Sequence, residues 1–224
     1  MSARDEILSS LRRSLKVSGN EGPRRAAVEA RLSGAPRGVV PARGQVDTKE
    51  RIGLFKKMAE SAFASVAVVA SASEAPGEAA RWLRDNNLPA TLRMGDDPRL
   101  AAMPWDSTAL ELAKGRSDGR DLNAVSHAFS GVAESGTLIM TSGPENPSTL
   151  NFLPDNHIVV LSAADLEGDY ESVFDRLREK YGKGQMPRTV NMITGPSRSA
   201  DIAQTMLLGA HGPRKLHIVI VDAP

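Results

Sequence analysis

The sequence predicts an α/β fold in which helices cover both faces of a largely parallel sheet. Residues 65–70 form a short, continuous apolar segment, which is typical of a strand buried on both faces. Amphipathic helical segments separate this strand from later ones, and strands that alternate with helices favour parallel βαβ units. The chain has 224 residues, 41% of them hydrophobic, which is enough for one substantial core.

Residues 1–16 are predicted to form an N-terminal helix, and residues 17–46 a linker. The apolar face of this helix consists of Ile7, Leu8, Leu11 and Leu15. This face could dock onto the main domain or onto a neighbouring subunit of a homo-oligomer. The linker is rich in Gly, Pro and Arg, so we expect at most a helical turn or two around residues 26–32.

The main domain is predicted to span residues 47–224. Asp47 suits the start of a helix whose apolar stripe is Ile52, Phe55, Ala59 and Phe63. Further helices are predicted at 76–87 and 170–181 and from Ser197 onwards, and strands at 65–70, 90–94, 109–114, 137–141, 157–162, 188–194 and 216–221. The mixed periodicity of residues 121–129 predicts neither helix nor strand.

Composition excludes several classes of function. The 28 basic and 27 acidic residues leave a net charge of +1, which gives no strong attraction to nucleic acid or to a membrane surface. Without cysteine the chain has no disulfide, no thiolate nucleophile and no ordinary iron–sulfur cluster. It shows neither a secretory signal nor an apolar run of membrane-spanning length, so the expected location is cytoplasmic.

The strand-to-helix turn predicted after residue 194 is a candidate anion site. Free backbone N–H groups and the positive end of a helix would face solvent there, beside the side chains of Ser197, Arg198 and Ser199. Alternatively, Ser197 or Ser199 only caps the helix and Asp201 complements its dipole. The residues alone leave both interpretations open.

Three motifs in order resemble the LUD domain family, which includes lactate utilisation protein C. They are AESGT at 133–137, GPSRSADI at 195–202 and HGP at 211–213. The resemblance implies a CoA transferase/isomerase-like fold and a role in bacterial growth on L-lactate. It also implies oxidation of L-lactate to pyruvate together with iron–sulfur partner proteins, with no cofactor in this chain. The predicted ligand-binding residues are Ser135, Gly136, Thr137, Gly195, Pro196, Ser197, Arg198, Ser199 and Asp201.

Glu134 is the candidate catalytic carboxylate. A glutamate in such a loop can act as a general base or attack an acyl thioester, as the glutamate of related CoA transferases does. It could equally accept hydrogen bonds from the loop or pair with Arg198. Glu134 precedes a predicted strand, so it reaches the Gly195 turn only if that strand runs antiparallel.

The four histidines do not form a metal-ligand set. His127, His157, His211 and His217 lack the i, i+4 spacing of a zinc-binding helix, and no metal is expected. His211 lies in a glycine-rich loop, where it could act as an acid or base. A helix starting at Ser197 would carry it to the opposite edge of the sheet, so a structural role is expected.

Three hypotheses of function remain. The chain is a component of L-lactate oxidation, an enzyme acting alone on a phosphorylated or CoA-linked molecule, or a non-enzymatic scaffold or ligand sensor. The sequence does not decide whether the chain itself is catalytic.

Overall fold

A computed structural model describes residues 2–199 and 207–222 of the chain, which divide into two units at residues 39 and 40. The first unit contains α1 (Ala3–Leu15) and α2 (Gly22–Gly34), neither of which has a buried residue. Helix α1 agrees with the prediction and begins with a capping box between Ser2 and Asp5. Helix α2 corrects it, because a full helix of 13 residues occupies much of the predicted linker. Pro23 in its first turn and the helix-forming residues that follow explain the difference.

The second unit begins earlier than Asp47. The short helix η1 (Ala42–Gly44) packs closely against Gly168 of the same unit: a Cβ atom at Gly44 would overlap the carbonyl oxygen of Gly168. Gln45 Nε2 donates a hydrogen bond of 2.8 Å to Asp169 Oδ2. Residues 40–46, predicted as linker, therefore belong to the second unit.

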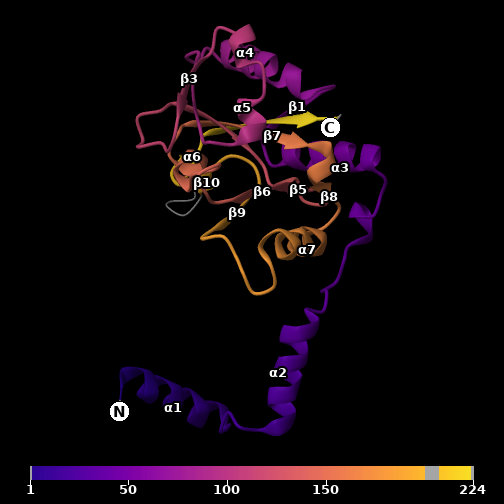
Figure 1. The fold of residues 1–224 in the computed structure, drawn as a ribbon, viewed down its shortest axis with the longest axis vertical. Coiled ribbons are helices and arrows are strands. Elements are labelled where there is room, and N and C mark those ends of the chain that lie inside the picture. Colours follow the sequence, from indigo (N-terminus) through magenta and orange to yellow (C-terminus); the bar gives the residue numbers. More distant parts are fainter. Residues whose placement is uncertain (1, 200–206, 223–224) are drawn as a thin grey trace. The chain divides into compact units, whose positions relative to one another are not determined.

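A six-stranded parallel sheet forms the centre of the second unit and confirms the predicted fold class (Figure 1). In spatial order its strands are β1 (Ser65–Val69), β12 (Lys215–Val221), β7 (Asn156–Ser162), β4 (Asn123–His127), β2 (Thr91–Met94) and β3 (Glu111–Lys114). The neighbouring strands pair in parallel. Strand β4, which the sequence did not predict, is buried along its whole length. Strand β1 lies at the edge, so Val68 is 44% exposed and the prediction of burial on both faces was wrong there.

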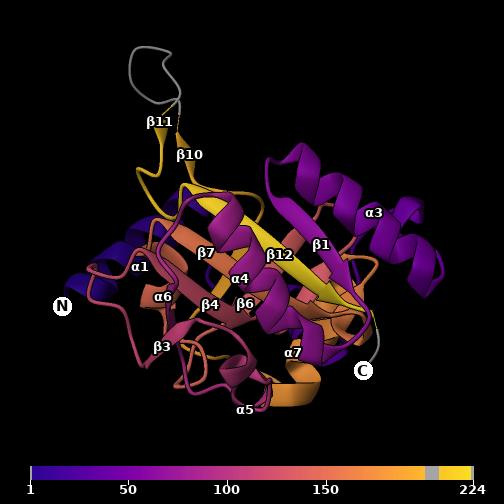
Figure 2. The ribbon, with the colours of Figure 1, turned by 90° about the horizontal axis from the view of Figure 1, so that it is seen from above.

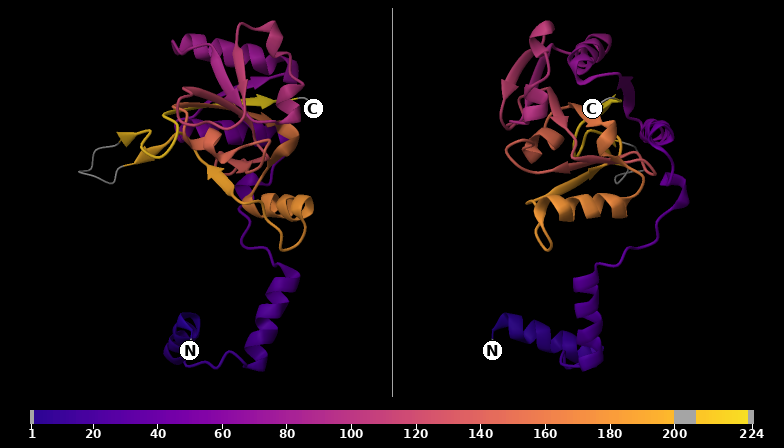
Figure 3. Two further views of the ribbon diagram at one scale, coloured as in Figure 1. Left: turned by 60° about the vertical axis from the view of Figure 1, so that its left-hand side comes forward. Right: turned by 45° about the vertical axis from the view of Figure 1, so that its right-hand side comes forward.

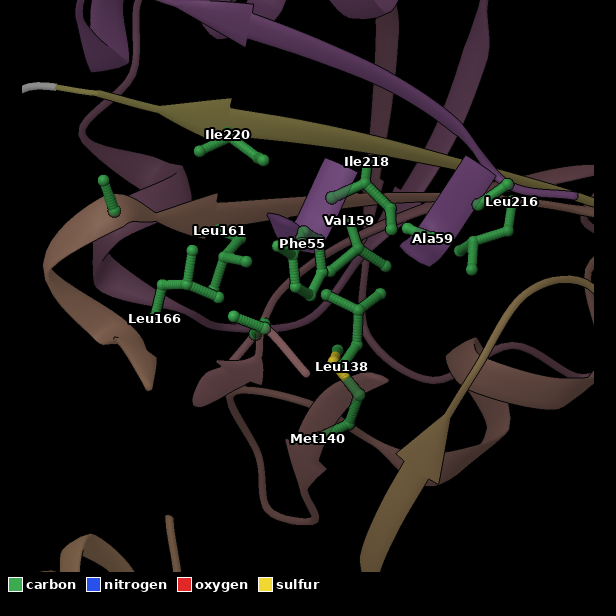
Figure 4. Close-up of a cluster of buried hydrophobic side chains, with 14 residues drawn as sticks. Phe55, Ala59, Leu138, Met140, Val159, Leu161, Leu166, Leu216, Ile218 and Ile220 are labelled. Carbon is green, nitrogen blue, oxygen red and sulfur yellow. The ribbon is translucent and has the colours of Figure 1, made fainter. Parts of the chain in front are cut away.

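Helices and a second sheet cover the two faces of this parallel sheet. On one face lie α4 (Ala75–Asp85), which Figure 2 shows lying across β12 and β7, and α5 (Pro98–Ala101). On the other face lie α3 (Thr48–Ser61) and β6 (Thr137–Thr141), whose side chains meet those of β7 and β12 in the main core (Figure 4). Strand β7 alternates accordingly, with Val159 in the α3 core and Val160 in the α4 core.

The second sheet has four strands and a mixed topology. Its order is β8 (Leu166–Glu167), β5 (Ser130–Val132), β6 and β9 (Val190–Ile193). Helix α7 (Tyr170–Tyr181) packs on its outer side through Val173 and Leu177, and Figure 3 shows α7 and α4 on opposite sides of the two sheets. Strand β9 was predicted to belong to a βαβ unit, which is wrong, because it pairs antiparallel with β6.

The predicted start of a helix at Ser197 is wrong, because the next two residues are in a strand. Residues Arg198–Ser199 form β10, which pairs antiparallel with β11 (Leu207–Leu208). Figures 2 and 3 show this ribbon standing away from both sheets. Residues 200–206, including Asp201, lie outside the described residues. A short helix, α6 (Ser148–Phe152), follows β6. No helix in the described ranges has the length and apolarity that a membrane crossing requires.

Candidate functional site

The turn from Ala133 to Gly136 joins β5 to β6 and is held by backbone contacts. The Glu134 N–H donates to the Gly168 carbonyl at 3.2 Å, and the Gly136 N–H donates to the Val132 carbonyl at 2.9 Å. Gly136 has φ +67°, and a Cβ atom there would overlap the backbone of Ala59 in α3. Only glycine combines this left-handed conformation with such close helix packing.

The antiparallel course of β6 brings this turn beside the Gly195 turn. Leu138 pairs with Ile193, so the start of β6 lies next to the end of β9. Thr137 Oγ1 is 2.7 Å from Thr194 Oγ1 and 2.8 Å from the Tyr170 hydroxyl. Ser135 Oγ joins the same hydroxyl network at 2.7 Å from Thr137 Oγ1. The structure therefore brings together two of the segments that the sequence singled out.

Glu134 is buried in this turn, with 5% of its surface exposed. Its Oε2 atom has no hydrogen-bond partner among residues 2–199 and 207–222. A buried carboxylate oxygen without a donor is costly, which makes it unlike an ordinary structural glutamate.

The Gly195 turn packs on the end of α3. Gly195 has φ +72°, and a Cβ atom there would overlap the Ala62 carbonyl oxygen. The Arg198 guanidinium carbon lies 3.6 Å from the centre of the exposed Phe63 ring, in a cation–π arrangement. Because Arg198 and Ser199 are in a strand, no helix dipole begins at these two residues, and that part of the argument for anion binding is lost.

Ser197 and His211 are in contact, which corrects the expected separation. The His211 N–H donates to Ser197 Oγ at 3.1 Å, and the Ser197 N–H donates to the Pro213 carbonyl at 2.8 Å. The contact uses the backbone of His211, whose side chain is exposed. It supports the expected structural role of this loop.

Two of the other histidines have structural partners. His157 is fully buried and its Nε2 lies 3.0 Å from Ser126 Oγ. His217 lies between Ser65 Oγ at 2.8 Å and Glu78 Oε1 at 3.1 Å, and its ring stacks on Trp82. Burial lowers the pKa of His157 to about 3 and that of His217 to about 4, so both are neutral at pH 7.

A cleft of about 380 Å³ opens at the carboxyl end of the parallel sheet, where β4 and β2 lie side by side. Within the parallel sheet the chain passes from β2 to β3 on one side; from β4 it passes through β5 and β6 of the second sheet and then enters β7 on the other side. Ligands of open α/β sheets bind at such a point of reversal. We call it the switch cleft; its lining includes Asp97, Arg99, His127, Asn146, Lys180 and Tyr181.

His127 is the last residue of β4 and is 6% exposed. Its Nδ1 lies 2.9 Å from the Ala128 carbonyl oxygen, which can only accept a hydrogen bond, so Nδ1 carries the proton. Burial, together with the charge of Arg99, lowers the pKa of His127 below 6.5 despite the opposite effect of Asp97. At pH 7 the ring is neutral and Nε2 is an acceptor.

Sequence reasoning missed the switch cleft because it missed β4. One wall of the cleft is the segment from Thr141 to Asn146, which includes the end of β6 in the second sheet. Gly95, just after β2, lets this wall lie close to the end of β2, since a Cβ atom at position 95 would overlap the Glu145 carbonyl oxygen. The available signal was a histidine at the end of the segment 122–127, ahead of the small residues Ala128, Ser130 and Gly131.

These features define an α/β protein with a parallel sheet, a second mixed sheet and a cleft at the switch point. The family model described as the LUD domain matches residues 52–221, and the chain belongs to this family. A crystal structure of a DUF162 family protein from Deinococcus radiodurans has the same fold, with a TM-score of 0.60 and 20% identity. The similarity covers 79% of this chain and 99% of that one.

Several relatives align with part of the chain. Lactate utilization protein C of Geobacillus thermodenitrificans is 31% identical over 146 residues, which cover 57% of this chain and 61% of the relative. Lactate utilization protein C of Halalkalibacterium halodurans is 32% identical over 120 residues, 53% of this chain and 52% of the relative. The uncharacterized protein NMB1437 of Neisseria meningitidis is 38% identical over 96 residues, 43% of this chain and 40% of the relative. Each alignment thus spans less than two thirds of the relative.

Proposed function

We propose that this chain is a component of L-lactate utilisation and takes part in the oxidation of L-lactate to pyruvate. The observation that carries the proposal is the LUD domain match over residues 52–221, together with relatives named lactate utilization protein C. The chain has no cysteine, so electrons from lactate would pass to iron–sulfur clusters in partner proteins. A cytoplasmic location stays a prediction.

Growth tests this role. A bacterial strain that lacks its own LUD-domain protein of this pathway is given the chain on a plasmid and grown on L-lactate or on glucose as sole carbon source. Restored growth on L-lactate is expected, and affinity purification from those cells is expected to recover iron–sulfur proteins. Failure on L-lactate by cells that contain the folded chain and grow on glucose contradicts the proposal.

Anion binding at the Gly195 turn is the second part of the proposal. Its support is the left-handed Gly195, the adjacent hydroxyl groups of Thr137 and Thr194 and the nearby Arg198 cation. The backbone amide signal of Gly195 is expected to shift when inorganic phosphate or L-lactate is titrated in an NMR experiment. Arg198→Gln should weaken the shift, whereas Lys57→Gln, an exposed change in α3, should not. An unchanged Gly195 signal contradicts this site.

A second candidate function is that of an enzyme acting alone on a CoA-linked molecule. The specific observation is the buried Glu134 Oε2 without a donor. In that reaction the carboxylate attacks the thioester carbonyl, the carbon–sulfur bond breaks, and CoA leaves as a thiolate that takes up a proton. Incubation with acetyl-CoA would then add an acetyl mass to the chain but not to the Glu134→Gln variant. If no mass is added, the chain has a binding or scaffold role. Truncation of α1 tests that role, because the truncated chain should then fail to recover partner proteins in an affinity purification.

A further inference from the structure

Some hydrogen-bond acceptors in the residues that line the switch cleft have no donor among residues 2–199 and 207–222. The neutral His127 offers an acceptor at Nε2, and no hydrogen bond to this atom is made within the described part of the chain. Asn146 is 5% exposed; its Nδ2 donates to the Thr141 carbonyl at 3.3 Å, and its buried Oδ1 has no partner among the described residues. His127 Nε2 is therefore an unused acceptor in the lining of the cleft, and a ligand that donates a hydrogen bond would satisfy it.

The charges of the cleft favour an anion. Arg99 is already neutralised, because it lies 2.8 Å from an Asp97 oxygen and 3.6 Å from an Asp165 oxygen. Lys180 forms no ion pair with a described residue, and its Nζ lies 5.2 Å from the Phe129 ring centre and 5.5 Å from that of Tyr181. The remaining carboxylate in the lining, Glu145, is exposed and thus well hydrated.

A hydroxyl donor and a carboxylate on one small molecule would match these groups. We propose that the switch cleft binds a small hydroxycarboxylate, with its carboxylate near Lys180 and its hydroxyl donating to His127 Nε2. The cleft volume of about 380 Å³ exceeds what such a molecule needs, so water shares the space. This inference deepens the proposed function and takes its choice of ligand from it, but it assigns a second site and holds even if the Gly195 turn binds nothing.

The proposed hydrogen bond to His127 Nε2 predicts that the cleft binds a hydroxy acid more tightly than a keto acid. A keto acid of the same size and charge offers His127 only another acceptor, and two facing acceptors repel. A keto acid would lose this hydrogen bond and leave His127 Nε2 desolvated without a donor, so its affinity should be roughly tenfold lower.

NMR of the intact chain, labelled at the histidine Cε1 carbons, tests the inference, with L-lactate and pyruvate as probes. The His127 signal, identified by its loss in His127→Asn, is expected to shift saturably with L-lactate and about tenfold more weakly with pyruvate. His127→Asn retains a donor for the Ala128 carbonyl but has no atom at the position of Nε2, so it should bind both probes equally. Lys180→Gln should weaken both, and Lys180→Arg should restore them.

Lys57→Gln is the matched control and should bind as the unchanged chain does. Equal affinity for L-lactate and pyruvate, or no histidine shift at tens of millimolar, overturns the inference. The NMR experiment measures binding by the isolated chain. Its outcome is therefore independent of the growth test, and either experiment can fail while the other succeeds. If His127→Asn does not fold, the Lys180 pair still decides the result.

Discussion

The backbone N–H of His211 donates a hydrogen bond to Ser197 Oγ at 3.1 Å, although 14 residues separate the two along the chain. The Gly209 N–H adds a bond of 3.0 Å to the Ser197 carbonyl. Ser197 thus closes the base of the ribbon formed by β10 and β11. The serine considered as a helix cap instead bonds to the segment that follows β11.

Removing the Ser197 hydroxyl should loosen this base. In Ser197→Ala, amide hydrogen exchange at His211 is expected to be about fivefold faster, since a net hydrogen bond contributes about 1 kcal/mol. Hydrogen exchange followed by NMR measures this rate. Ser10→Ala, in α1, serves as the control and should leave the His211 rate unchanged. Equal His211 protection in both variants contradicts the closing role of Ser197.

Glycine at position 136 should be required for stability. Gly136→Ala places a Cβ against the α3 backbone at a positive φ, so we expect a loss of about 2–4 kcal/mol in the free energy of unfolding. Gly115→Ala is the matched control, because Gly115 has φ +103° but open space around it; the expected loss is about 1 kcal/mol. Urea denaturation of both variants gives the values, and equal losses would rule out the helix contact as the cause.

Mild acid should destabilise the fold through its buried histidines. The unfolded chain takes up protons near pH 6.5, whereas His157 and His217 in the folded chain stay neutral until about pH 3 and 4. Their contribution is complete above pH 6.5 and decreases as the pH falls, by about 2 kcal/mol for each histidine between pH 7 and 5. Urea denaturation at both pH values measures the loss. His217→Gln should remove its own share of about 2 kcal/mol from this loss, and the exposed change Lys57→Gln should leave the loss unchanged.

The carboxylate of Asp97 should stabilise the entrance of the switch cleft. Burial alone would raise its pKa, but the hydrogen bonds and charge of Arg99 lower it. Asp97 also caps α5 by accepting from the Arg99 N–H at 2.8 Å. We expect Asp97→Ala to cost about 2–3 kcal/mol and Asp97→Asn, which keeps an oxygen for the cap, less. The exposed Asp118→Ala should leave the urea midpoint unchanged, and a similar midpoint for Asp97→Ala would contradict the stabilising role.

Local signals in the sequence identified most elements. Asp47 and Gly182 lie where the predictions put the start of α3 and the end of α7, because caps act on groups three or four residues away. The apolar runs of β7 and β12 were found for a similar reason, since their hydrophobic content is visible without knowing their neighbours.

Strand β4 shows where such signals fail. Asn123, Ser126 and His127 are polar, yet all are buried, and their partners come from elsewhere in the chain or from the strand's own end. Asn123 donates to the carbonyl oxygens of Pro89 and Thr91, and Ser126 contacts His157. Polar side chains whose hydrogen-bond partners are distant in the chain have the same sequence pattern as loop residues, so the strand could not be predicted from the sequence.

By itself the sequence determined the α/β class, the caps and most strands, since these depend on side-chain period and on neighbours within one helical turn. The tertiary structure decided the antiparallel course of β6, the ribbon at Arg198 and the meeting of His127, Asn146 and Lys180 in one cleft. These depend on pairing between segments far apart in the chain, where many alternatives have similar local preferences and only the packed whole selects among them.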